Sequence, residues 1–109
     1  MPPARLRRIL TVTGVVQGVG FRPFVHGLAT GLGLGGIVGN DSGSVFIEVE
    51  GPPPAVDEFT RRLREEAPPL AAIETVTSAD VAATGDASFR IVASRVRAGA
   101  NTLISPDIA

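Results

Sequence analysis

The chain has 109 residues, which corresponds to one compact domain at the usual size of about 150 residues per domain. Ten arginines stand against eleven acidic residues, and a formal net charge of −1 argues against nucleic-acid binding, which favours a basic surface. The absence of cysteine excludes disulfides, a thiol nucleophile and cysteine-ligated metals, and the single histidine, His26, excludes a histidine-rich zinc site. With so few candidate ligands, we expect no metal site. No segment has the pattern of a signal peptide or the length of a membrane-spanning helix, so we expect a cytoplasmic protein.

The first half of the chain is predicted to form a strand, a helix and two more strands. β-Branched residues dominate residues 9–16, which indicates a strand with one buried face. Pro23 is predicted to lie in the first turn of a helix that starts near Arg22, because its missing N–H costs nothing there. The apolar stripe of this helix comprises Phe24, Val25, Leu28, Ala29 and Leu32. Residues 36–39 form a short apolar run typical of a strand, residues 40–43 a predicted turn, and residues 45–50 alternate as a third strand.

The second half is predicted to form a helix and two strands. Pro52–Pro54 lead into the helix, whose inward face carries Val56, Phe59 and Leu63. Its outer face carries four i,i+4 charge pairs, which are Asp57–Arg61, Glu58–Arg62, Arg61–Glu65 and Arg62–Glu66. Pro68 and Pro69 end this helix, and strands are predicted at 73–81 and 89–93, around a turn at Gly85–Asp86. The order β-α-β-β-α-β-β predicts an α+β ferredoxin-like sandwich with two helices on one face of a mainly antiparallel sheet. We expect this domain to span residues 1–97, with 98–109 a tail or linker toward a downstream module.

A glycine-rich segment between the first strand and the first helix carries the candidate chemistry. We call residues 17–22 (Gln17, Gly18, Val19, Gly20, Phe21, Arg22) the glycine loop. Its glycines allow several N–H groups to converge at a helix N-terminus, and the Arg22 guanidinium suits a phosphate or carboxylate. Position 19 is Val and the chain has no lysine, which excludes a Walker loop, and Pro23 excludes a dinucleotide fingerprint. From spacing alone, a simple tight turn with a solvated Arg22 remains an equal alternative.

Several stretches together resemble one known family. Residues 14–29, GVVQGVGFRPFVHGLA, resemble the signature of the acylphosphatase family, in the form found in the N-terminal domains of HypF-type carbamoyltransferases of hydrogenase maturation. Residues 40–45, NDSGSV, are similar to the second motif of the family, and residues 45–51 and 67–73 match in kind and order. Residues 104–109, ISPDIA, resemble the run that enters the next HypF module, so the resemblance covers essentially the whole chain.

The resemblance implies an acyl-phosphate hydrolase in which the glycine-loop amides and Arg22 bind the phosphate and Asn40 holds the attacking water. It implies carbamoyl phosphate as substrate, no cofactor in this domain, and as partners the downstream HypF-like modules and the carbamoyl-accepting maturation protein HypE. Because an acyl phosphate is already activated, charge neutralisation and a positioned water are the main requirements. A module that binds or channels carbamoyl phosphate without hydrolysing it is the alternative function.

Other polar residues near the motifs have simpler interpretations. His26 is predicted to be a solvated surface residue, Asp41 a turn residue, and Ser42 and Ser44 lack a histidine partner for nucleophilic catalysis. Gln17 is equally suited to face the ligand or to stabilise a turn. Gly39 departs from the family, whose members commonly carry a longer, often basic residue before the asparagine. An RNA-binding module of similar layering is set aside, because it needs exposed sheet aromatics and a basic face.

Overall fold

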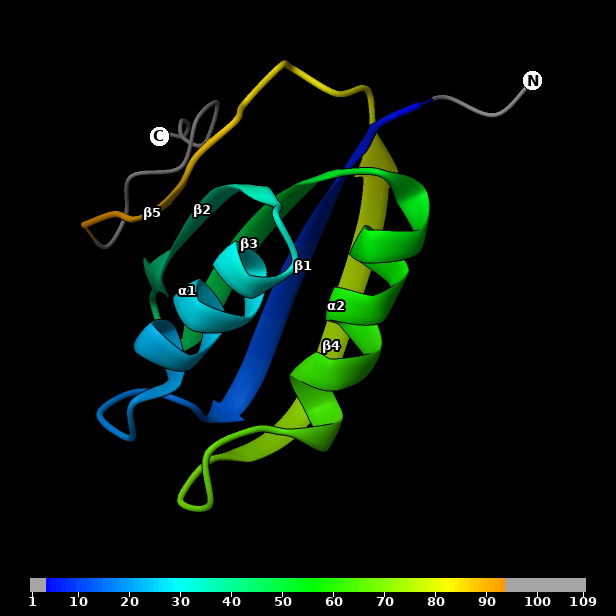
Figure 1. The fold of residues 1–109 in the computed structure, drawn as a ribbon. Helices are drawn as coiled ribbons and strands as arrows, with labels where there is room; N and C mark the ends of the chain where they lie inside the picture. The colour runs from blue at the N-terminus through cyan, green and yellow to red at the C-terminus, as the bar shows by residue number, and fades with distance from the viewer. Residues whose placement is uncertain (1–3, 94–109) are drawn as a thin grey trace, which may run out of the picture.

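The computed structural model describes residues 4–93, which form five strands and two helices (Figure 1). In chain order they are β1 (Leu6–Val15), α1 (Phe21–Gly31), β2 (Gly35–Asp41), β3 (Ser44–Gly51), α2 (Pro53–Glu65), β4 (Ala72–Val81) and β5 (Phe89–Ile91). This order of helices and strands confirms the predicted order. The predicted boundary at residue 97 and the tail 98–109 lie outside the described residues.

The sheet has the strand order β4-β1-β3-β2-β5, and both helices lie on one of its faces (Figure 1). β1 pairs antiparallel with β3 and β4, and β2 pairs antiparallel with β3, so β1-α1-β2 and β3-α2-β4 are two interlocked split βαβ units. The short β5 pairs parallel with β2 at the far edge. The α+β ferredoxin-like sandwich with a mainly antiparallel sheet is therefore confirmed.

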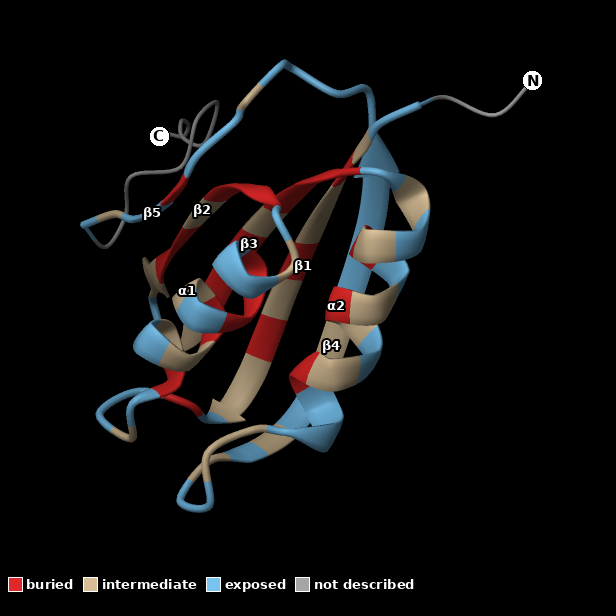
Figure 2. Cartoon of the chain, viewed as in Figure 1, coloured by how far each residue is buried: buried red, intermediate tan, exposed pale blue. Residues whose placement is uncertain are grey.

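The hydrophobic core fills the space between the helices and the sheet. Figure 2 shows buried positions on β1, β3 and the inner sides of the helices, whereas the edge strand β4 is largely exposed. The predicted inward residues of α2, Val56, Phe59 and Leu63, are fully buried, and each such side chain stabilises the fold by about 1.5–3 kcal/mol. The other core residues are Leu10, Val12, Val16, Phe21, Val25, Leu28, Ala29, Leu34, Val38, Val45, Ile47, Val49 and Phe89.

A buried carboxylate fastens the long connection between the two edge strands. The segment between β4 and β5 crosses the end of the sheet (Figure 1), because these strands lie at opposite edges. Glu50, at the end of the central strand β3, is completely buried and accepts hydrogen bonds from the Arg7 guanidinium and the backbone N–H groups of Thr84, Gly85 and Asp86. The Glu50 side chain thereby holds in place the crossing segment that leads into β5.

The start of α1 agrees with the prediction: the helix begins at Phe21, directly after Gly20 in a left-handed conformation, so that Arg22 and Pro23 lie in its first turn. Two other local predictions were wrong in detail. Asn40 and Asp41 belong to β2, since their pairing with β3 continues to a two-residue tip at 42–43. Within residues 4–93, Asp57 pairs with Arg8 of β1, at 3.0 Å, rather than with Arg61, which pairs with Glu58 and Glu65.

Candidate functional site

The glycine loop is held at both ends by buried side chains. Val16, which precedes the loop, and Phe21, the first residue of α1, are each only 1% exposed, whereas the glycines between them face solvent. Gly18 has φ 75° and Gly20 has φ 81°, conformations that residues with a Cβ rarely adopt. The loop between these two fixed points projects from the body of the domain (Figure 1), so its backbone N–H groups can face solvent.

The N-terminus of α1 carries positive charge that the described residues leave uncompensated. No side chain caps the helix and no acidic residue lies in its first turn, although the first N–H groups of any helix lack intrahelical acceptors. Arg22, the second residue of α1, adds a cation where the helix dipole already disfavours one, and it forms no ion pair within residues 4–93. An anion with several acceptor oxygens can accept hydrogen bonds from the free N–H groups and also neutralise the charge of Arg22.

Asn40 lies at the same end of the sheet, on the helix-facing side. Strand register pairs Asn40 with Val45 and Val45 with Val12, and residues directly opposite each other on neighbouring strands share a face of the sheet. The Oδ1 atom of Asn40 is buried and has no hydrogen-bond partner among the described residues. A buried acceptor without a donor costs about 1–3 kcal/mol, so this position favours a bound donor such as water.

Gln17 connects the glycine loop to the β2–β3 hairpin that carries Asn40. Its side-chain Nε2 donates hydrogen bonds to the backbone oxygens of Asp41, at 3.4 Å, and Ser44, at 3.3 Å. Of the two interpretations left open by the sequence, the structure thus favours a stabilising role for the Gln17 side chain. The carbonyls of Asp41 and Ser44 were not anticipated, because a partner 24 or 27 residues away leaves no local signal in the sequence.

Comparison with known proteins identifies the family. The acylphosphatase family model, described as "Acylphosphatase", matches residues 8–91. The chain belongs to the acylphosphatase family. It is 42% identical over 80 residues to the acylphosphatase of Mannheimia succiniciproducens, a match that covers 72% of this chain and 88% of that protein.

Longer relatives contain the same domain. The chain is 47% identical over 109 residues to the carbamoyltransferase HypF2 of Cupriavidus necator, which covers 98% of this chain but only 14% of that protein. Among solved structures, full-length HypF in the phosphate- and nucleotide-bound form matches with a TM-score of 0.81 and 38% identity, over 86% of this chain and 12% of that one. The acylphosphatase from Bacillus subtilis matches with a TM-score of 0.76 and 34% identity, over 80% of this chain and 98% of that one.

The remaining candidate residues of this acylphosphatase-family domain lie away from the glycine loop or have structural partners. His26 is half-buried rather than fully solvated, because its ring packs edge-on against Phe89 of β5 at a centroid distance of 6.0 Å. The Asp41 carboxylate accepts a hydrogen bond from the N–H of the next residue, Ser42, at the start of the hairpin tip. Gly39 is buried, and a Cβ there would lie 2.7 Å from Cζ of Phe46, on the face of the sheet opposite to Asn40. A longer residue at position 39 would therefore point away from the glycine loop.

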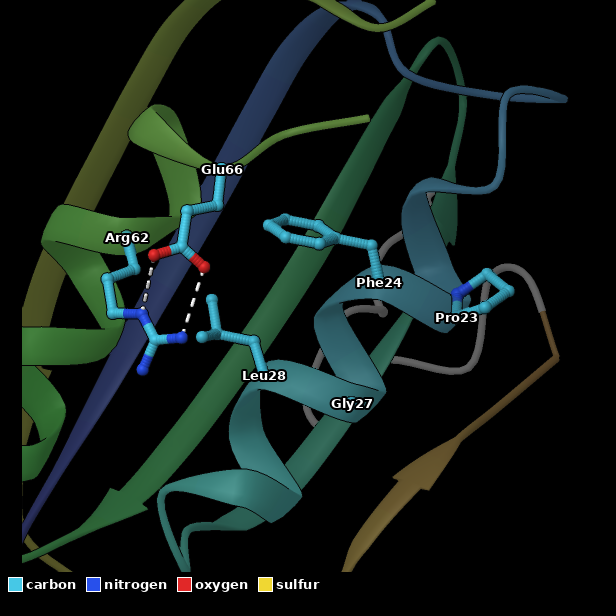
Figure 3. A pocket seen from close by; sticks show the side chains of 6 residues that line it. All are labelled: Pro23, Phe24, Gly27, Leu28, Arg62 and Glu66. Carbon is cyan, nitrogen blue, oxygen red and sulfur yellow. Dashed lines mark hydrogen bonds and ion pairs between the residues drawn. The ribbon is translucent and has the colours of Figure 1, made fainter. Parts of the chain in front are cut away.

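A groove of about 310 Å³ lies between the two helices of the acylphosphatase-family domain and contains none of the predicted site residues. Figure 3 shows Phe24 and Leu28 of α1 facing Arg62 and Glu66 of α2, which are joined by two hydrogen bonds of 2.9 and 3.1 Å. Elsewhere in residues 4–93, no cluster of three or more His, Cys, Asp or Glu side chains has an arrangement suited to a metal ion. No helix of the described segment is long and apolar enough to cross a membrane.

Proposed function

We propose that this domain hydrolyses acyl phosphates at the glycine loop, with carbamoyl phosphate as its substrate within a HypF-like carbamoyltransferase. The observation that carries the proposal is the buried Oδ1 of Asn40, which has no hydrogen-bond partner within residues 4–93. It lies at the same end of the sheet as the N-terminus of α1, which has no side-chain cap in this part of the chain and bears Arg22. This combination offers one position for an anion and a neighbouring position for a water molecule.

Binding rests on the glycine loop and Arg22. The N–H groups at the start of α1 and the guanidinium of Arg22 together donate to the phosphoryl oxygens, which neutralises the charge that repels an incoming nucleophile. Charge-assisted hydrogen bonds of this kind contribute about 1.5–3 kcal/mol each. The exposed glycines allow the phosphate to approach the backbone closely.

Turnover rests on Asn40. The Oδ1 atom accepts a hydrogen bond from a water molecule and thereby orients a lone pair of the water oxygen toward phosphorus. The new bond joins the water oxygen to phosphorus, the bond from phosphorus to the acyl oxygen breaks, and the acyl group leaves as a carboxylate. The proton of the water passes to the phosphate product. Because a carboxylate is a good leaving group, the reaction requires neither a general acid nor a covalent nucleophile.

The substrate and context are inferred from the relatives. The chain spans about one seventh of the length of the HypF2 carbamoyltransferase that it resembles. Carbamoyl phosphate is the acyl phosphate that suits a carbamoyltransferase, and the remaining modules of such a protein, with HypE as carbamoyl acceptor, are the proposed partners. Similarity to acylphosphatases of nearly the length of the domain supports hydrolysis by the domain itself.

A phosphate-release assay tests this function. The purified 109-residue chain is incubated with carbamoyl phosphate, with acetyl phosphate, and with a phosphomonoester as the matched control that lacks the activated acyl group. We expect release from both acyl phosphates and none from the monoester. Equal release from all three would contradict an acyl-phosphate mechanism, and binding without release would favour the channelling module.

A further inference from the structure

We propose that Gln17 is a positioning residue that fixes the Asn40 hairpin against the glycine loop, and that its side chain does not bind the phosphate. The inference deepens the proposed function and rests on it for its kinetic consequences. The observations that carry it are the two hydrogen bonds from Gln17 Nε2 across the gap between these segments.

The Gln17 amide joins both strands of the hairpin at once. Asp41 is the last residue of β2 and Ser44 the first residue of β3, on either side of the two-residue tip, and Gln17 donates to the carbonyl oxygen of each. Asn40 immediately precedes Asp41, so the amide holds the backbone one residue away from the proposed water-binding side chain. A shift of the hairpin relative to the loop would move Asn40 by a comparable distance.

The number of N–H donors on the Gln17 amide distinguishes a positioning role from phosphate binding. A glutamine amide has two N–H donors on its nitrogen, and two carbonyl oxygens occupy them here. The remaining polar atom, Oε1, is an acceptor and would repel a phosphate oxygen. Gln17 could therefore donate to phosphate only by releasing the hairpin.

The consequence is a specific kinetic signature. The glycine loop is anchored independently by the buried Val16 and Phe21, so loss of the Gln17 bonds leaves the anion site in place. The water held by Asn40 is displaced, and misplacement of a reacting group by about 1 Å can cost roughly 100-fold in rate. We expect kcat to fall about 10- to 100-fold, with KM and the inhibition constant of inorganic phosphate unchanged.

The test combines Gln17→Met, which keeps the length of the side chain and removes its donors, with Asn40→Ala and the double variant. Ser42→Ala is the matched control on the exposed hairpin tip and should retain wild-type kinetics. If Gln17 acts through Asn40, kcat of the double variant is no lower than that of Asn40→Ala alone. Weaker phosphate inhibition in Gln17→Met, or multiplied losses in the double variant, would overturn the inference. Gln17→Asn, one methylene shorter, replaces the methionine variant if that chain does not fold.

An NMR measurement that does not depend on turnover tests the role of Gln17 separately from the proposed hydrolysis. In Gln17→Met, the NMR signals of the Asn40 side-chain amide should shift, and relaxation should report a less ordered side chain. Unchanged signals in a folded variant would refute the positioning role even if the enzyme is active. Conversely, a wild-type chain with no turnover refutes the proposed hydrolysis, while the amide signals still decide the role of Gln17.

Discussion

Replacing Glu50 by glutamine should destabilise the domain far more than the same change at the neighbouring acid Glu48. Both carboxylates bond Arg7, at 2.9 Å from Glu50 and 2.8 Å from Glu48. Glu50 is fully buried and also accepts the N–H groups of Gly85, at 2.6 Å, and Asp86, at 3.1 Å. A glutamine amide cannot accept all of these bonds, because its nitrogen is a donor.

The magnitude follows from the number and burial of the lost bonds. Two or three charge-assisted bonds at about 1.5–3 kcal/mol each, combined less than additively, predict a loss of about 3–5 kcal/mol in the free energy of unfolding. Glu48 accepts one hydrogen bond from Arg7, and the Oε1 of a glutamine can still accept it, so we expect Glu48→Gln to cost about 1 kcal/mol. Urea denaturation at pH 7 measures both variants against the wild type.

The pH dependence gives an independent check. Burial by itself raises the pKa of Glu50, but hydrogen bonds from the Thr84 backbone, Arg7 and the Gly85 backbone outweigh it and lower the pKa from 4.5 to about 2. The charged groups around it are Arg5, Arg7 and Asp86. Because the pKa is lower in the folded state, the stabilisation is present above pH 4.5 and is lost as the pH falls toward 2.

The stability difference between the wild type and Glu50→Gln should therefore narrow by about 3 kcal/mol between pH 5 and pH 2. Other carboxylates titrate in both proteins and cancel in this comparison. Two results would refute the reasoning: equal destabilisation by the Glu48 and Glu50 substitutions, or a difference that stays constant across this pH range.

Three further predictions concern the glycine loop and Gly39. Inorganic phosphate should raise the melting temperature, with about 2.7 kcal/mol of stabilisation at one hundred times its Kd; a titration with no shift contradicts an anion site. Arg22→Ala should weaken phosphate binding by about 1.5–3 kcal/mol in calorimetry. Arg22→Lys should recover little of this affinity, because an ammonium group cannot form the two parallel hydrogen bonds of a guanidinium; unchanged affinity in Arg22→Ala would contradict the binding role of Arg22. Gly39→Ala should lower stability by about 1–3 kcal/mol through overlap with Phe46 and leave phosphate affinity unchanged, whereas unaltered denaturation would show that the ring yields freely.

The sequence predicted the fold well where periodic patterns repeat within one element. The α2 stripe of Val56, Phe59 and Leu63 and the alternation of β3 each specify a buried face through local spacing alone. The order of the elements then restricts the topology to very few arrangements, and the ferredoxin-like sandwich is among them. Pro23 correctly indicated the first turn of α1, because a residue without a backbone N–H is tolerated there.

Contacts between distant segments were beyond sequence reasoning. Glu50 reads as a solvent-facing strand residue, and its burial depends on the crossing segment at 84–86 returning to it. The half-buried His26 likewise reflects the position of β5, which follows it by more than sixty residues. At the candidate site, the motif led to the prediction of the glycine loop and Asn40 as site residues, whereas the hydrogen bond from Gln17 to the hairpin could be found only in the structure.

The central claim is that Asn40 orients water at a phosphate held by the glycine loop, and one paired measurement tests it most directly. Phosphate release from carbamoyl phosphate and calorimetric binding of inorganic phosphate are measured on the same preparations of wild type and Asn40→Ala. We predict that the wild type turns over, and that Asn40→Ala binds phosphate equally well but hydrolyses about 10²–10³ times more slowly. Equal turnover by the two proteins, or a wild type that binds phosphate and releases none from carbamoyl phosphate, would contradict the account.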